Sequence, residues 1–179
     1  KMKTILLALF VALTIPSQIF PQWEWLNPRP HGNANNRIAF GGNANEYTIV
    51  GNAGIIMKTT NDGVDWSIQN SGTDINLKDI YISGNEGIAV GNSGTILRTS
   101  DGGITWHLVN SGTTTHLTAV AFPTSNTGII TGWNGLILHT TNGGTNWDSI
   151  ATPTTQRLYG VSFADADNGY AVGNAGGGV

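Results

Sequence analysis

Short runs in which apolar residues alternate with small or polar ones recur along most of the chain. The run from Leu117 to Phe122 has the two-residue period of a β-strand, because side chains on a strand point alternately to opposite faces. Runs of the same form begin at Leu77 and at Leu158, so the three starts are evenly spaced. This pattern predicts short strands in a repeating unit of about 40 residues.

Two turn motifs keep the same interval. Gly-Asn-x-Gly or a close variant occupies residues 51–54, 91–94, 132–135 and 173–176. A segment rich in Thr, Asn, Asp and Gly precedes Trp66, Trp106 and Trp147, and Trp25 lies one period before Trp66, in register. Residues of these types favour tight turns between strands. Three markers that share one period indicate an internal repeat.

Each unit contains four predicted strands. In the third unit they cover residues 117–122, 128–131 and 136–140, and a fourth strand starts near Trp147. Four strands in about 40 residues predict an all-β fold, a β-propeller built from four-stranded blades. A solenoid of β-turns is the alternative, although its repeats are usually shorter.

The chain holds about four such blades and is expected to form an incomplete ring. The propeller region is residues 22–179, with blade units near 26–66, 67–106, 107–147 and 148–179, the last without its third and fourth strands. We expect either the front part of a longer protein or a short chain that completes its ring with another copy. Open strand edges favour such self-association.

The segment 1–21 has the features of a secretory signal peptide. Lys1 and Lys3 precede an apolar run at residues 5–15, which fits such a signal but is too short for a membrane span of about 20 residues. A buried strand or helix is the alternative. We expect residues 1–21 to direct a secreted, periplasmic or cell-surface protein, with no membrane span once they are removed.

Composition excludes several other classes of protein. Charged residues make up 11% of the chain, against about 25% in an average domain, which disfavours helical bundles. The hydrophobic fraction of 39%, with six Trp, is enough for a packed core. A net charge of -3 and the lack of any Lys/Arg cluster disfavour nucleic acid as a partner. Without Cys there is no disulfide or thiolate metal site.

The segments that end in Trp carry a family resemblance. The pattern Ser/Thr-x-Asp/Asn-x-Gly-x-x-Trp at residues 59–66, 99–106 and 140–147 resembles the Asp-box, or BNR repeat, of sialidases and sortilin-type receptors. The fuller pattern at residues 89–106 most resembles the photosystem II stability and assembly factor family and its secreted bacterial relatives. The resemblance implies a β-propeller that acts as a scaffold for protein interaction or assembly. In these families the box is a folding element away from the active site.

The box residues explain such a structural role. Asp101 can accept backbone N–H groups across the turn, Gly103 can supply a positive φ, and Thr99 can bond the turn backbone. Trp106 is expected to bury its ring between neighbouring blades. Each box offers at most two carboxylates, so we expect no metal and no cofactor. The predicted structural positions are Thr59, Asn61, Gly63, Trp66, Thr99, Asp101, Gly103, Trp106, Thr140, Asn142, Gly144 and Trp147.

No catalytic set is evident, so we expect a protein that is not an enzyme. Sialidase chemistry needs three arginines and a Tyr–Glu pair, and the chain has only four Arg with no such pair suggested. Glycosidases need two carboxylates that face one cleft, and Asp79, Asp165 and Asp167 are the candidates. These acids fall on a strand or a turn, where they commonly have structural roles. An exported sialidase-like, glycosidase-like or carbohydrate-binding module is the alternative function.

One turn departs from the repeat and predicts a binding site. Trp133 stands where the other units have Asn, and an exposed ring in a short turn is a common anchor for proteins or sugars. Asn134, His116 and Arg157 are expected on the same face of the propeller. The alternative is that the Trp133 ring folds over its own blade.

A second recurrence is basic. Lys58, Arg98 and His139 share one strand position, which predicts a partial cationic stripe or a solvated strand edge. We expect a protein partner for the module, with carbohydrate as the other candidate.

Overall fold

The computed structural model describes residues 32–174, so the predicted signal peptide lies outside the described residues. Within residues 32–174, every regular element is a strand except for three single 3-10 turns. The strands form three four-stranded antiparallel sheets and one two-stranded sheet, each in sequence order. This arrangement confirms the predicted all-β architecture of repeated four-stranded units. No helix within these residues is long or apolar enough to cross a membrane.

The strand bounds repeat at the predicted interval. The first sheet contains β1 (Asn35–Phe40), β2 (Tyr47–Gly51), β3 (Ile56–Thr59) and β4 (Ser67–Gln69). The second contains β5 (Leu77–Ser83), β6 (Glu86–Gly91), β7 (Ile96–Thr99) and β8 (His107–Val109). The third contains β9 (Leu117–Ala121), β10 (Gly128–Gly132), β11 (Ile137–Thr140) and β12 (Asp148–Ile150). The fourth contains β13 (Leu158–Phe163) and β14 (Gly169–Gly173).

The turns between the second and third strands of the first three sheets are η1 (Asn52–Gly54), η2 (Asn92–Gly94) and η3 (Trp133–Gly135). The last strand of each of these sheets follows the box Trp. These sheets therefore end at residues 69, 109 and 150, slightly beyond the unit ends expected from the sequence.

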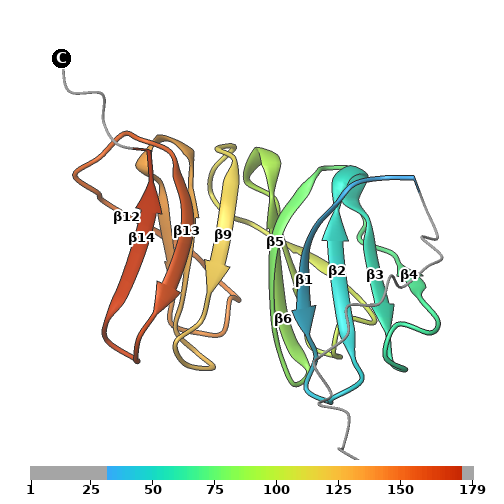
Figure 1. Cartoon of the computed structure of the whole chain (residues 1–179). Coiled ribbons are helices and arrows are strands. Elements are labelled where there is room, and N and C mark those ends of the chain that lie inside the picture. The colour runs from blue at the N-terminus through green and yellow to red at the C-terminus, as the bar shows by residue number, and fades with distance from the viewer. Residues whose placement is uncertain (1–31, 175–179) are drawn as a thin grey trace, which may run out of the picture.

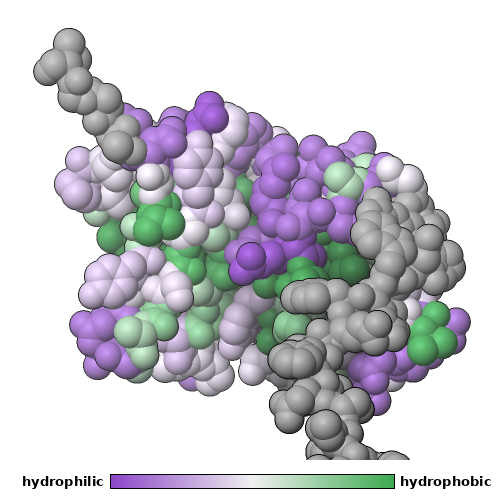
Figure 2. Space-filling model, in the orientation of Figure 1, coloured by the Kyte–Doolittle hydropathy of each residue, from purple (hydrophilic) through white to green (hydrophobic). Residues whose placement is uncertain are grey.

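The sheets stand next to one another with their first strands adjacent. Figure 1 shows β13, β9, β5 and β1 side by side in one row, and each neighbouring pair is in contact. The first strand of every sheet is thus the inner one, and the later strands lie progressively farther out. Apolar surface remains exposed at the left of Figure 2, where Figure 1 places β13 and β14. Tyr170 and Val172 of β14 are 73% and 63% exposed.

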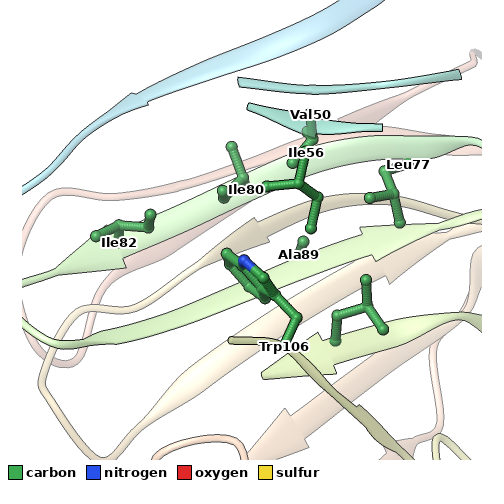
Figure 3. Close-up of a cluster of buried hydrophobic side chains, with 8 residues drawn as sticks. Val50, Ile56, Leu77, Ile80, Ile82, Ala89 and Trp106 are labelled. Atoms are coloured by element: carbon green, nitrogen blue, oxygen red, sulfur yellow. The ribbon is translucent and has the colours of Figure 1, made fainter. Parts of the chain in front are cut away.

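The core lies between sheets. In the cluster of Figure 3, Val50 and Ile56 from the first sheet pack against Leu97 and Trp106 from the second. An equivalent cluster joins the second and third sheets and contains Trp147. The rings of Trp106 and Trp147 are only 6% and 7% exposed. Alternation along the strands produces this arrangement, because each sheet offers one face to the preceding sheet and one to the next.

Basic side chains on the third strands also join neighbouring sheets. Lys58 Nζ donates to the Gly102 carbonyl at 2.7 Å and lies 3.2 Å from a Glu46 oxygen. One unit later, Arg98 Nε donates to the Gly143 carbonyl at 3.1 Å, and its guanidinium also contacts Glu86. Lys58 is buried and Arg98 is half-buried. The expected cationic stripe is therefore wrong for these two residues, which connect one sheet to the box turn of the next.

Candidate functional site

The turns that contain η1, η2 and η3 share one backbone geometry. Ala53, Ser93 and Asn134 all have a left-handed conformation, with φ of 55°, 54° and 57°. A glycine follows each, and a Cβ added at Gly94 would lie 1.9 Å from the Thr113 carbonyl oxygen. This close approach packs the turn against the loop that leads to the next sheet. The second glycine of the motif is therefore required by space as well as by φ.

A side chain from the following sheet caps the first two of these turns. The N–H of Ala53 donates to Asn76 Oδ1 at 2.8 Å, and the N–H of Ser93 donates to His116 Nδ1 at 2.9 Å. Asn76 and His116 each directly precede the inner strand of the next sheet. Because Nδ1 of His116 accepts a hydrogen bond, it carries no proton in this geometry. His116 therefore has a structural role in the second turn.

The third turn, η3, has no cap of this kind. Arg157 takes the position of Asn76 and His116, but a guanidinium has only donors and cannot accept the N–H of Asn134. Instead, Arg157 Cζ lies 3.6 Å from the centre of the Trp133 ring. A cation over an indole face is stabilised by about 0.5–2 kcal/mol, depending on exposure. The contact places the guanidinium over the ring.

His116 contacts the same ring. Its centroid lies 4.4 Å from that of Trp133, with an angle of 81° between the ring planes, an edge-to-face arrangement. The backbone N–H of Trp133 also donates to the His116 carbonyl at 2.9 Å. The ring thus contacts both His116 and Arg157.

The structure brings the four predicted site residues together at one turn. Asn134 and Arg157 are exposed, and Trp133 and His116 are half-buried. Trp133 is neither a free ring in solvent nor a core residue, since Arg157 covers part of it. The cluster offers a cation, an amide and an aromatic surface, which are typical of protein recognition. It contains no pair of groups arranged for acid–base catalysis.

The carboxylates considered for catalysis serve the fold. Asp79 is 7% exposed, and its oxygens accept the backbone N–H groups of Ile80 and Val120, both at 2.9 Å. Arg37 Nε lies 3.0 Å from Asp79 Oδ1, so this carboxylate connects the inner strands of three sheets. Burial raises the pKa of Asp79, against the opposing effect of these hydrogen bonds.

The other two acids lie in the turn between β13 and β14. Asp165 accepts the N–H groups of Asp167 and Asn168, and these bonds lower the pKa of Asp165. Asp79 and Asp165 both line a groove of about 490 Å³ along the inner strands, whereas Asp167 does not. Among residues 32–174, no three His, Asp or Glu side chains are placed to hold a metal ion.

The box turns lie at the opposite end of the sheets from this cluster and are tightly bonded. Thr99 Oγ1 accepts the N–H of Gly103 at 2.9 Å, and Asp101 Oδ1 accepts that of Thr105 at 2.9 Å. The indole N–H of Trp106 donates to the Gly103 carbonyl at 3.1 Å. Hydrogen bonds from Thr105 and Thr99 hold the pKa of Asp101 well below its usual range. Gly103 has a φ of 88°.

Sequence reasoning missed the caps and the links between sheets. Asn76, His116 and Arg157 recur at the period of the repeat, directly before equivalent strands. That spacing is the signal that identifies them as one structural position.

A family model matches the part of the chain that contains the repeated motifs. The profile of the family described as "Photosynthesis system II assembly factor YCF48" matches residues 65–155, half of the chain. No curated protein matches the sequence. The family resemblance drawn from the box pattern is therefore confirmed by an independent match.

Several solved structures share the fold. YCF48 from Cyanidioschyzon merolae is 25% identical, with a TM-score of 0.62 over 71% of this chain and 40% of that one. YCF48 bound to a D1 peptide is 20% identical, with a TM-score of 0.67 over 80% of this chain and 47% of that one. An ancestral GH74 enzyme is 22% identical, with a TM-score of 0.65 over 78% of this chain and 22% of that one. This chain spans less than half the length of each, and the matches confirm the propeller fold.

Proposed function

Because the chain belongs to the family of the photosynthesis system II assembly factor YCF48, we propose that it is a non-catalytic β-propeller module that binds a protein partner. The observation that carries this proposal is the cluster of Trp133, Arg157, His116 and Asn134 on one turn face. A related YCF48 structure holds a D1 peptide, which supports a peptide segment as the ligand class.

The cluster suits a peptide for physical reasons. Arg157 lies over the Trp133 ring and is exposed, and a guanidinium carries five N–H donors that a ligand can accept. Trp and Arg are the residues in which binding energy at protein interfaces is most often concentrated. The adjacent Asn134 adds an exposed amide that both donates and accepts.

A binding assay on the full chain tests this site. A fluorescent D1 peptide is titrated with wild type, Trp133→Ala and Phe40→Ala, and binding is followed by anisotropy. Phe40 is the matched control, because it is an exposed aromatic residue (69%) far from the turn face. It lies at the end of β1 opposite to the end that is next to the η1 turn. We expect Trp133→Ala to weaken binding about 30-fold, as for a 2 kcal/mol anchor, and Phe40→Ala to leave it unchanged.

Two results would contradict the proposal. If wild type shows no saturable binding of the peptide, the peptide ligand is excluded. If Trp133→Ala lowers the melting temperature by many degrees while affinity stays intact, the ring serves packing alone. A glycan array run in parallel tests the carbohydrate-binding alternative, to which the fold shared with a GH74 enzyme lends weak support. A glycan ligand lost in Trp133→Ala would replace the peptide proposal.

We also propose that the protein is exported. The basic start and the apolar run at residues 5–15 support this location. A fusion to alkaline phosphatase, which is active only outside the cytoplasm, tests it. We expect activity from the full chain and none after removal of residues 1–21, and equal activity from both fusions would contradict the proposal.

A further inference from the structure

The polar groups of the Trp133 cluster are nearly all hydrogen-bond donors. Arg157 has only donors, and His116, whose Nδ1 accepts the Ser93 N–H, carries its proton on Nε2. The indole N–H of Trp133 and the backbone N–H of Asn134 donate to no group within residues 32–174. The side-chain oxygen of Asn134 is the remaining side-chain acceptor of the cluster. A ligand group that is rich in acceptors therefore fits this cluster.

The positive charge of Arg157 is not neutralised by a carboxylate of the described part of the chain. The side chains that form ion pairs among residues 32–174 are Arg37, Lys58 and Arg98. Arg157 forms none there, and the contact of its guanidinium is the Trp133 ring. The loops at residues 111–116 and 152–157 contain no Asp or Glu. An exposed guanidinium without a carboxylate beside it is available to an anionic ligand.

Charge is also divided between the two ends of the sheets. Figure 1 shows β1, β9 and β13 running downward, so the end that carries the η turns is at the top and the box end is at the bottom. Most carboxylates of residues 32–174 lie at the box end, within the first two boxes, directly after the third box, or beside the turns that join first and second strands.

The end with the η turns has a different balance of charge. Its carboxylates are Asp74, in the loop before the second sheet, and the buried Asp79, which pairs with Arg37. Lys78 and Arg157, the two basic residues of the described chain that form no ion pair, also lie at this end. This end therefore has the more positive potential, which favours the approach of an anionic ligand.

We propose that the partner binds the Trp133 cluster through a carboxylate, which accepts hydrogen bonds from the Arg157 guanidinium. This inference rests on the proposed function and specifies the group of the peptide that is recognised. A carboxylate can accept two parallel N–H donors from one guanidinium, and such charge-assisted bonds are roughly twice as strong as neutral ones. The carboxylate belongs either to an Asp or Glu side chain or to the C-terminus of the partner, and the experiment below separates the two sources.

A peptide array tests the ligand group without a known partner. Random decapeptides are printed with a free carboxyl end and, separately, with an amide end, and the full chain is applied as wild type and as Trp133→Ala. We expect the peptides that bind wild type but not Trp133→Ala to be enriched in Asp and Glu, or to require the free carboxyl end. Enrichment identifies a side-chain carboxylate, and dependence on the free end identifies the C-terminus.

The array also separates this inference from the proposed function. Trp133-dependent peptides that show neither property would overturn the carboxylate ligand and leave the partner site intact. If no peptide is lost with Trp133→Ala, the partner site is itself refuted, and the carboxylate ligand with it.

Two charge-matched variants then test whether Arg157 holds the carboxylate. The strongest Trp133-dependent peptide is labelled with fluorescein and titrated by anisotropy. Arg157→Gln should weaken binding at least about tenfold, as for the loss of a hydrogen bond to a charged group. Lys78→Gln removes the same charge at the same end, two sheets away, and should keep the affinity within about threefold because salt screens distant charges. Equal losses would mean that general charge attracts the peptide, and would overturn the role of Arg157.

A matching change in the peptide tests for direct contact. The carboxylate of the peptide is replaced by an amide, through Asp→Asn, Glu→Gln or an amidated end. This change should cost wild type about tenfold and cost Arg157→Gln little, because the two groups are coupled. Equal losses with both proteins would refute the contact between Arg157 and the carboxylate. Far-UV circular dichroism verifies that the variants fold.

Discussion

Replacing Trp106 by Ala tests whether the box Trp holds neighbouring sheets together. The ring is 6% exposed and packs in one cluster with Val50 and Ile56 of the first sheet and Leu97 of its own. Its indole N–H also donates to the Gly103 carbonyl at 3.1 Å. The substitution therefore removes apolar contact between two sheets and one hydrogen bond within the box turn.

The magnitude follows from the buried area. A buried Trp covers about 150–250 Å², worth roughly 4–6 kcal/mol at about 25 cal/mol per Å², and Ala retains only a small part of this. Measured Trp→Ala substitutions in cores cost about 3–5 kcal/mol, since the site relaxes in part. The hydrogen bond adds about 1 kcal/mol. We expect Trp106→Ala to lower the free energy of unfolding by about 4 kcal/mol.

Urea unfolding followed by far-UV circular dichroism measures this loss. In a repeat protein the stability is roughly a sum of one term for each unit and one for each interface. Because Trp106→Ala weakens the interface between the first and second sheets, the first sheet should unfold at a lower urea concentration than the others. Trp66→Ala is the graded comparison, because Trp66 is only half-buried and should cost about half as much. Equal losses from the two variants, or a loss below about 1.5 kcal/mol for Trp106→Ala, would refute the reasoning.

Two further predictions address the turns. The bonds from Thr105 and Thr99 lower the pKa of Asp101, so its ionised form stabilises the fold above the unfolded pKa of about 4, and this contribution is lost as pH falls. Urea midpoints should thus fall more steeply below about pH 4 in wild type than in Asp101→Asn, and parallel profiles would contradict this. Gly94→Ala should cost about 3 kcal/mol or more, because the new Cβ meets the Thr113 carbonyl. Gly112 has a similar φ of 68° but open space, so Gly112→Ala should cost only about 1 kcal/mol, and equal melting temperatures would be inconsistent with the packing.

The repeat could be predicted because its backbone conformation requires particular residue types at fixed positions. A left-handed residue followed by a second positive φ favours glycine at the second of these positions, as at Gly54, Gly94 and Gly135. Trp106 and Trp147 mark the interface between the first and second sheets and that between the second and third, because each ring is large and buried there. Strand number, turn positions and the box hydrogen bonds all follow from such local constraints.

The contacts between units could not be predicted in the same way. Asp79 contacts Arg37 and Val120. These three residues lie in three different units and share no motif. The link from Lys58 to Gly102 crosses from one unit to the next and uses a backbone carbonyl, which has no sequence signature. The partners of Asp79 and Lys58 depend on how far each sheet is rotated from its neighbour. The alternation of apolar and polar residues along a strand does not specify that rotation.

The candidate site arises where two repeated positions change together. In the first two units the turn begins with Asn52 or Asn92, and a side chain of the following sheet accepts a hydrogen bond from the next residue of the turn. In the third unit Trp133 begins the turn and Arg157 lies over its ring. Replacing the acceptor by a donor leaves the Asn134 N–H without the side-chain cap of the first two turns, at an exposed position where water can accept it. The contact of Arg157 with Trp133 instead places a cation and an aromatic ring together at the surface. Departures from local rules are expected at functional positions, which favours recognition over packing as the reason for this pair.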